Sequence, residues 1–181
     1  MRDIAAAADI SPGNLYNYFK GKGELLFFCQ DSSLDRMLAS LEKSRRSRAS
    51  ATEKLVSIIE SHLRCVLDEV EGSAAHLFAN GLPARLHEQI AGKRDRYERG
   101  IRNLIAAGVQ SGEFAPCEPA LVARAILGAS NWSVRWFNPE GRLTAGEVAS
   151  EFARYLVRGL SAKAEPSSVG RRKRSGKAAP R

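Results

Sequence analysis

The 181-residue chain is poor in cysteine and contains no long apolar run. Its three cysteines, Cys29, Cys65 and Cys117, are odd in number and widely spaced, which excludes the usual zinc-ligand spacings and argues against a disulfide framework. Unpaired thiols suit a reducing compartment. No stretch approaches the ~18 consecutive apolar residues of a membrane span, and no signal-peptide pattern is visible. We therefore expect a protein of the cytoplasm with no membrane partner.

The sequence also lacks the motifs that mark common catalytic sites. It has no nucleophile elbow, phosphate-binding glycine loop, metal motif or dinucleotide-binding fingerprint. Its histidines, His62, His76 and His87, show no metal-ligand spacing, and paired carboxylates occur only within runs of mixed charge. We therefore predict no enzyme activity, no catalytic residue, no metal and no cofactor.

Most of the net positive charge of the chain lies at its C-terminus. Residues 163–181 hold seven basic groups and one Glu, a balance of +6 out of the total of +8. The segment contains Gly, Ser and Pro without an apolar period, so we expect a disordered tail over residues 162–181. Two roles stay open for it: non-specific binding to DNA phosphates, and solubilisation alone.

The N-terminal segment has the pattern of two short helices joined by a tight turn. Ile4, Ala5 and Ala8 fall on one face, and four consecutive alanines favour helix over strand, which predicts a helix over residues 2–9. Ser11 then suits the N-cap of a second helix, because its hydroxyl can accept a hydrogen bond from a free backbone N–H at the helix start.

The second helix, predicted over residues 12–19, carries side chains suited to reading DNA. Pro12 suits its first position, and Leu15 and Phe19, four residues apart, point inward. The other faces carry Asn, which can pair bidentately with adenine, and Tyr, which can reach phosphates. This pattern fits a helix-turn-helix, whose second helix enters the major groove. An ordinary helical hairpin with exposed tyrosines has the same composition and spacing, so the pattern alone leaves both open.

The rest of the chain reads as helices, and no strand is predicted, so the fold class is all-α. A linker helix over 23–46 would join the DNA reader to a helical body over 28–161, which binds ligand and dimerises. The mixed-charge run from Lys93 to Arg99 favours a solvated face with i,i+4 ion pairs. Apolar periodicity and two capping boxes, Ser50–Glu53 and Thr144–Glu147, predict further helices over 50–71, 73–80, 84–111, 120–137 and 144–161.

The run from Ile4 to Leu26, IAAAADISPGNLYNYFKGKGELL, resembles the signature segment of the TetR family of bacterial transcriptional regulators. Asp9 stands where Gly is usual in that pattern, and Asp tolerates a left-handed backbone. The family pattern is matched by Ile4, Ala5, Ala8, Ile10, Ser11, Gly13, Leu15, Tyr16, Tyr18, Phe19, Lys22 and Leu25.

The resemblance implies a repressor that binds a pseudo-palindromic operator in double-stranded DNA, and it implies roles for eight residues. Groove contacts are expected from Gly13, Asn14, Asn17 and Tyr18. Phosphate or other backbone contacts are expected from Arg2, Ser11, Tyr16 and Lys22.

The DNA-binding domain in residues 1–27 is expected to be incomplete. The domains that it resembles have three helices, and this chain begins at the second. Two helices of ~8 residues do not supply an apolar cover for Ile4, Ala8 and Leu15. We expect a start codon assigned to an internal Met, with a real truncation as the alternative. A true start at Met1 would leave a helical dimerisation and ligand-binding module with impaired DNA binding.

The last two predicted helices, over 120–137 and 144–161, are apolar over more than one face. Small residues such as Ala125, Gly128 and Ala129 allow close approach of another helix. Because monomers seldom expose large apolar patches, we infer that these helices form a four-helix interface in a homodimer. A dimer would place two recognition helices ~34 Å apart, about one turn of DNA.

Residues 128–160 resemble one branch of TetR-like repressors, which regulates fatty-acid, acyl-CoA and steroid catabolism. Some members of the branch sense CoA thioesters, which implies a small-molecule effector such as an acyl-CoA or another CoA thioester. Arg124 and Arg135 would meet an acidic group of that ligand. Plain core packing is the alternative for each apolar candidate. The other expected pocket residues are Leu63, Val66, Leu67, His76, Phe78, Tyr97, Ile101 and Trp132.

Overall fold

The computed structural model describes residues 1–67 and 82–162, and within these ranges every regular element is a helix. The only β feature of the described residues is an isolated bridge between Phe114 and Ser161. The predicted all-α fold is therefore confirmed. In chain order the elements are α1 (Arg2–Ala7), α2 (Pro12–Tyr18), α3 (Lys22–Arg46), α4 (Ala51–Leu67), α5 (Ala84–Gln110), α6 (Pro119–Trp132), the 3-10 turn η2 (Ser133–Arg135) and α7 (Ala145–Arg158).

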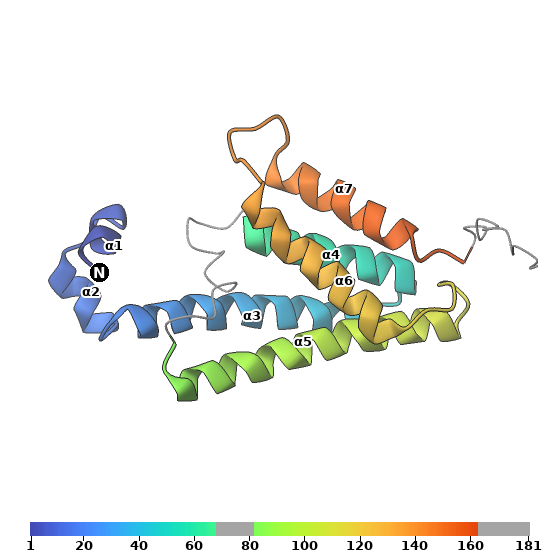
Figure 1. The fold of residues 1–181 in the computed structure, drawn as a ribbon, viewed down its shortest axis with the longest axis horizontal. Coiled ribbons are helices and arrows are strands. Elements are labelled where there is room, and N and C mark those ends of the chain that lie inside the picture. The colour runs from blue at the N-terminus through green and yellow to red at the C-terminus, as the bar shows by residue number, and fades with distance from the viewer. Residues whose placement is uncertain (68–81, 163–181) are drawn as a thin grey trace, which may run out of the picture.

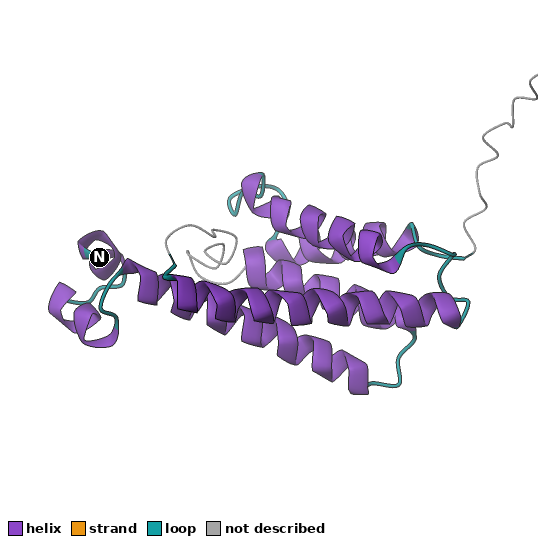
Figure 2. Ribbon diagram, turned by 60° about the horizontal axis from the view of Figure 1, so that its bottom comes forward, coloured by secondary structure: helices purple, strands orange, loops and turns teal. Residues whose placement is uncertain are grey.

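Helix α3 connects two parts of the molecule. Its N-terminal end carries α1 and α2, which stand apart from the other helices, and its remaining length runs beside α5 (Figure 1). The second view shows the same separation between the small N-terminal unit and the helical body (Figure 2). Helix α3 is therefore the element that joins the helical body to α1 and α2.

Helix α4 lies at the centre of the body, because it packs against α3, α5, α6 and α7. Its apolar residues recur at helical spacing and are almost fully buried, which removes a large apolar area from water. They meet Ile101 and Ile105 from α5 and Met37 from α3. The buried residues that α4 contributes to the core are Ala51, Leu55, Ile58, Ile59, Leu63, Cys65 and Val66.

Both predicted capping boxes are present. The Ser50 N–H donates to Glu53 Oε2 at 2.9 Å while the Glu53 N–H donates to Ser50 Oγ at 3.2 Å. Thr144 and Glu147 make the corresponding pair of bonds at 2.8 and 3.2 Å. These bonds satisfy backbone N–H groups that have no partner within the helix, so a capping box marks a helix start. The starts of α4 and α7 were therefore predicted correctly from the sequence.

Several helix ends differ from the predicted bounds. Helix α1 ends at Ala7 rather than residue 9, because Asp9 adopts a left-handed backbone. The helix predicted over 120–137 ends at Trp132, where η2 follows and the Ser133 hydroxyl donates to the Ser130 carbonyl at 2.6 Å. Helix α7 ends at Arg158, because the following residues pair with the loop after α5. The predicted helix over 73–80, the end of the one over 50–71 and the basic tail lie outside the described residues.

Candidate DNA-binding and effector sites

The turn between α1 and α2 is set by Asp9 and Ser11. Asp9 has a φ of 52°, in the left-handed region that the sequence predicted it would tolerate. Ser11 Oγ accepts from the Asn14 N–H at 3.1 Å, and Pro12 is the first residue of α2. These local features fix the direction in which α2 leaves the turn.

Helix α2 presents most of its side chains to solvent. Leu15 is its buried residue, at 5% exposure, whereas Tyr16 and Tyr18 are 51% and 73% exposed. The structure places all eight predicted DNA-contacting residues within α1, α2, the turn and the first residue of α3. Those accessible besides the tyrosines are Arg2, Ser11, Gly13, Asn14, Asn17 and Lys22.

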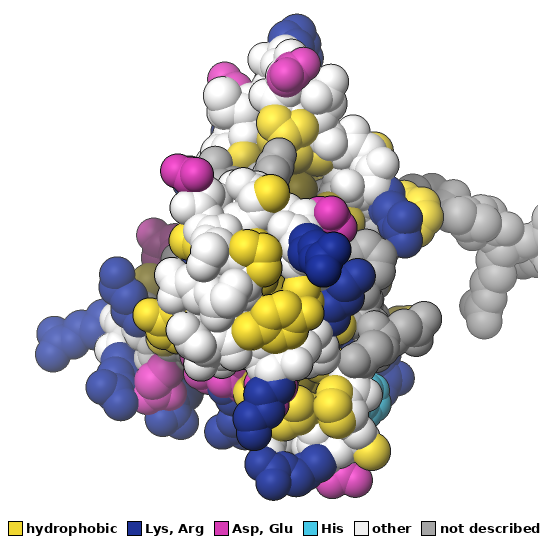
Figure 3. Space-filling view, turned by 90° about the vertical axis from the view of Figure 1, so that its left-hand side faces the viewer, with side chains coloured by type: hydrophobic (Ala, Val, Ile, Leu, Met, Phe, Trp, Pro, Cys, Tyr) yellow, Lys and Arg dark blue, Asp and Glu magenta, His cyan; other side chains and the backbone are white. Residues whose placement is uncertain are grey.

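The surface at this end of the molecule has little acidic character at its centre (Figure 3). Uncharged and apolar groups occupy much of the middle of the face, and Lys and Arg side chains lie just to the right of the middle as well as along its left and lower margins. Basic groups at the edge of an uncharged reading surface suit a duplex, because phosphates flank the groove in which base edges lie.

The inner side of the α1–α2 unit is only partly covered. Ala5 is fully buried, and the Phe19 ring lies 5.4 Å from the Phe28 ring on α3. Ile4 and Phe28 nevertheless remain 39% and 56% exposed. Within the described residues, the unit is therefore held to α3 by few apolar contacts.

A cavity of about 250 Å³ lies where α3, α4, α5 and α6 meet. The buried His62 ring stacks on Tyr97, with centroids 5.7 Å apart, and its Nε2 lies 2.9 Å from Asn131 Oδ1. Burial, with a smaller effect of nearby Cys65, raises the pKa of Tyr97, so its phenol is neutral at pH 7. The cavity is lined by Leu34, Met37, His62, Arg94, Asp95, Tyr97, Glu98, Leu127 and Asn131.

This cavity combines apolar walls with groups that can orient a polar part of a ligand. Leu34, Met37 and Leu127 supply the apolar surface, whereas Tyr97 and Asn131 supply hydrogen-bonding atoms. Such a mixture is typical of a small-molecule pocket. Among the described residues no group of three or more side chains is arranged to hold a metal ion.

Comparison with known proteins decides the family. The family model described as "Bacterial regulatory proteins, tetR family" matches residues 1–27. A second family model, described as "Tetracyclin repressor-like, C-terminal domain", matches residues 48–160. The chain belongs to the TetR family. It is therefore a DNA-binding transcriptional regulator, as its N-terminal residues predicted.

Individual relatives of this TetR-family protein agree with that assignment. It is 26% identical to the transcriptional repressor KstR2 of Mycolicibacterium smegmatis over 170 residues, which cover 89% of this chain and 80% of the repressor. It matches the TetR-family regulator PfmR of Thermus thermophilus with a TM-score of 0.75 and 30% identity, over 88% of both chains. It also matches AibR, solved with isovaleryl coenzyme A and operator DNA, with a TM-score of 0.71 and 22% identity, over 89% of this chain and 86% of AibR.

The structure distributes the predicted effector-pocket residues of this TetR-family chain over several environments. Tyr97 lines the 250 Å³ cavity. Leu63, Val66 and Ile101 are buried in the core, and Leu67 packs against it. His76 and Phe78 lie outside the described residues.

The three remaining candidates, Arg124, Trp132 and Arg135, are exposed. Trp132 is 65% exposed on the outer side of α6. Arg124 Nε lies 3.6 Å from the carboxylate of Glu98, which lines the cavity. Arg124 thus contacts a residue that lines the cavity.

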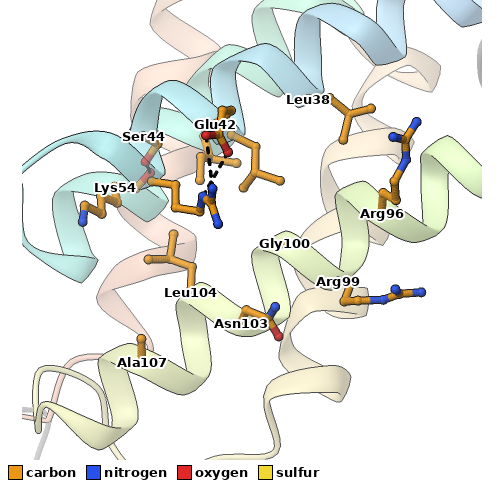
Figure 4. Close-up of a pocket in the computed structure, with 13 residues that line it drawn as sticks. Leu38, Glu42, Ser44, Lys54, Arg96, Arg99, Gly100, Asn103, Leu104 and Ala107 are labelled. Carbon is orange, nitrogen blue, oxygen red and sulfur yellow. Dashed lines mark hydrogen bonds and ion pairs between the residues drawn. The ribbon is translucent and has the colours of Figure 1, made fainter.

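Sequence reasoning missed a second, larger cavity of about 510 Å³ between α3, α4 and α5 (Figure 4). It also read Lys93–Arg99 as a solvated face paired within its own helix. Lys93 instead contacts Asp31 and Asp35 on α3, while Arg96 and Arg99 line the larger cavity. The alternation of sign in the run hid these contacts, because sequence spacing does not show which partners a neighbouring helix supplies.

Helix α6 of this TetR-family chain carries an exposed stripe of apolar and small residues. Leu121 and Trp132 are 67% and 65% exposed, and Ala125 and Gly128 between them are also exposed. Their spacing of four, three and four residues places them on one face of the helix. Tyr155 on α7 is exposed as well, at 75%.

Proposed function

We propose that this TetR-family regulator is a ligand-responsive repressor that binds a pseudo-palindromic operator as a homodimer. It acts in the cytoplasm and catalyses no reaction. The observation that carries the proposal is the exposure of α2, which is capped by Ser11, anchored by Leu15 and held at the end of the long helix α3.

The side chains of α2 divide into two kinds of DNA contact. Asn14, Asn17 and Tyr18 face the major groove, where an amide can pair bidentately with adenine. Tyr16, together with Lys22 at the start of α3, holds phosphates, which position the helix without reading sequence. Gly13 lets the backbone of α2 approach the duplex closely, since it carries no side chain.

Dimerisation uses the exposed stripe on α6 together with α7. The stripe offers apolar area at both ends and small residues in the middle, so two copies of α6 can approach closely. A two-fold axis through this face gives each protomer the same contacts as its partner. The two α2 helices then read two half-sites about one DNA turn apart.

The effector is a CoA thioester whose acyl part enters the cavity beside His62 and Tyr97. Support comes from the resemblance of residues 128–160 to repressors of acyl-CoA and steroid catabolism, and from AibR, whose structure contains isovaleryl coenzyme A. A cavity of about 250 Å³ is below the usual size for a whole drug-sized ligand. The nucleotide part of the thioester therefore lies outside it, near Arg124.

Release from the operator follows from a change in the position of α3. Leu34 and Met37 of α3 line the cavity, and α3 carries the α1–α2 unit. An effector that fits one position of α3 better than the other shifts the population toward that position. The coupling free energy between effector and operator equals the difference in effector-binding free energy between the two positions of α3.

Selection of duplexes from a random library by the full chain tests operator binding. We expect an enriched pseudo-palindrome whose half-site centres lie ~34 Å apart. A Tyr16→Ala, Lys22→Ala double variant should lose the enrichment, whereas Arg85→Ala, an exposed change on α5, should keep it. No enrichment above random competitor would refute the proposal.

Competition on the selected operator tests the effector. Branched and straight acyl-CoA esters should release the DNA at concentrations where free CoA does not, because the acyl part supplies the contact with the cavity. Tyr97→Phe should change the concentration of thioester required without changing operator affinity in its absence. Equal action of free CoA and its thioesters would contradict the proposed effector site.

A further inference from the structure

The cavity of about 510 Å³ lies in the half of the body that is farther from α1 and α2. It is formed by the C-terminal half of α3, the first turns of α4 and the C-terminal half of α5 (Figure 4). It shares no lining residue with the 250 Å³ cavity. The two sites are therefore separate.

The inner wall of this cavity is apolar. Leu38 and Leu41 come from α3, Ile58 from α4 and Leu104 from α5. In the close-up, Leu38 and Leu104 point into the space between α3 and α5 (Figure 4). Gly100 lets the Leu41 side chain pack directly against α5, because a Cβ at that position would overlap Leu41 Cδ2. The wall therefore suits an alkyl chain better than a polar molecule.

The mouth of the cavity is basic. Arg45, Lys54, Arg96 and Arg99 line it, against the single carboxylate of Glu42. That carboxylate is already engaged, because Arg45 Nε and Arg46 Nε lie 3.0 and 2.8 Å from its oxygens. The mouth thus has an excess of positive charge that Glu42 does not neutralise.

Among the described residues, three of these four cations lack a counter-charge. Within residues 1–67 and 82–162, Lys54, Arg96 and Arg99 make no ion pair. In the close-up, Arg96 extends from α5 toward Leu38 of α3 (Figure 4). Guanidinium groups beside an apolar wall favour a ligand that carries a carboxylate on an apolar body.

We propose that this cavity binds a small amphipathic carboxylate, with its alkyl chain against Leu38, Leu41, Ile58 and Leu104 and its carboxylate at Arg96 and Arg99. The site is additional to the effector cavity and does not depend on the ligand bound there. Both parts of the ligand are needed: the chain gains from leaving water, and the carboxylate gains charge-assisted hydrogen bonds.

Calorimetric titration of the full chain with decanoate, below its micelle-forming concentration, tests the site. We expect saturable binding, with decanol binding at least about tenfold more weakly because it lacks the charge-assisted bonds. Acetate, which lacks the chain, should give no measurable binding. Equal affinity for decanoate and decanol, or no saturable binding of decanoate, would overturn the proposal.

Two variants on the exposed side of α5 locate the ligand. An Arg96→Ala, Arg99→Ala double variant should weaken decanoate binding about tenfold and leave decanol binding unchanged. Asn103→Trp, which fills the mouth, should abolish binding of both. Their matched controls on α5, Arg85→Ala and Gln89→Trp, are exposed and lie outside the cavity, so they should bind as the unchanged chain does. Unaltered decanoate binding in Asn103→Trp would place the ligand elsewhere and refute the site.

Discussion

The ammonium group of Lys93 on α5 lies 2.5 Å from the carboxylate of Asp31 on α3. Asp35, one turn further along α3, contacts the same ammonium at 2.6 Å. Burial by itself lowers the pKa of Lys93, but hydrogen bonds to the two carboxylates outweigh it and raise the pKa above its usual value. Lys93 thus ties α5 to the half of α3 that leads to the DNA-binding unit.

Replacement of Lys93 by Met should destabilise the fold by about 1–2 kcal/mol, since the Lys93 and Asp31 side chains are only 17% and 29% exposed and lose charge-assisted bonds. Urea unfolding measures the change. Lys43→Met, at the exposed end of α3, is the control and should stay within about 0.5 kcal/mol. In a double-mutant cycle, Lys93→Met should cost less when Asp31 is already Asn. Strict additivity would show that the two groups do not interact.

Base reading and phosphate binding by α2 are separable. Asn14→Ala and Asn17→Ala should relax base choice at particular operator positions, each at a cost of about 1–3 kcal/mol for the preferred base. Tyr16→Phe should weaken binding to all sequences alike, because it removes a phosphate contact. Binding to a panel of single-base operator variants distinguishes the two patterns. A uniform loss from both Asn changes would argue against base reading by these side chains.

Local signals explain why so much of the N-terminal unit could be predicted. The Ser11 cap, Pro12 at the helix start and the left-handed Asp9 are each decided within a few residues of chain. The capping boxes of α4 and α7 are local as well. Such features do not depend on how distant helices pack, so the sequence contains enough information to place them.

Contacts between distant helices could not be predicted in the same way. The run containing Lys93 and Arg96 has ion-pair spacing within α5, but α3 supplies the partners of Lys93 and a cavity faces Arg96. The N-terminus of α4 is a second example, since its free N–H groups are capped by Glu113, over 60 residues later in the chain. Neither relationship has a signature in the spacing of the residues.

Glu113 gives the fold a measurable dependence on pH. Hydrogen bonds from the N–H groups of Ala51 and Thr52, both at 3.1 Å, lower the pKa of the Glu113 carboxyl. Its contribution to stability is therefore fully present above the unfolded pKa of about 4.3 and is lost as the pH falls through the lower folded value.

Glu113→Gln should lower Tm at pH 7 by about 2–4 °C, since it weakens the cap of α4. The gap between Tm values of the variant and the unchanged chain should close at acidic pH, where the native carboxyl is protonated. Glu88→Gln, on the exposed side of α5, should show no gap at any pH. A gap for Glu113→Gln that is independent of pH would contradict the charge-assisted cap.

Gly128 offers a clean test of the proposed dimer face. A Cβ at this position meets no atom of the protomer within 4 Å, so Gly128→Arg should leave the fold intact while placing a charge in the middle of the α6 stripe. Sedimentation velocity at micromolar concentration should show a dimer for the unchanged chain and a monomer for the variant. Gly92→Arg is a matched control, because Gly92 on α5 is equally open. Dimerisation of Gly128→Arg with unaltered affinity would exclude this face.

Two glycines within α5, Gly92 and Gly108, should respond to replacement by Ala with stability changes of opposite sign. At Gly108 an added Cβ would overlap the ring of Phe114, and that ring is only 2% exposed and cannot move aside without disturbing the core. Overpacking of this kind costs about 1–3 kcal/mol, so Gly108→Ala should destabilise the protein. At Gly92 the added methyl meets nothing within 4 Å, and Ala is favoured over Gly inside a helix by roughly 0.5–1 kcal/mol.

Gly92→Ala should therefore raise the midpoint of urea unfolding, and Gly108→Ala should lower it. The two variants can be compared directly, because both replace Gly by Ala within α5. Phe114→Leu, which removes the ring, should reduce the cost of Gly108→Ala when the two are combined. The expectation depends on the close packing of α5 against the loop that follows it, where the Phe114 N–H donates to the Gly108 carbonyl at 3.0 Å. Stabilisation by both alanines would show that this packing is looser than the structure describes.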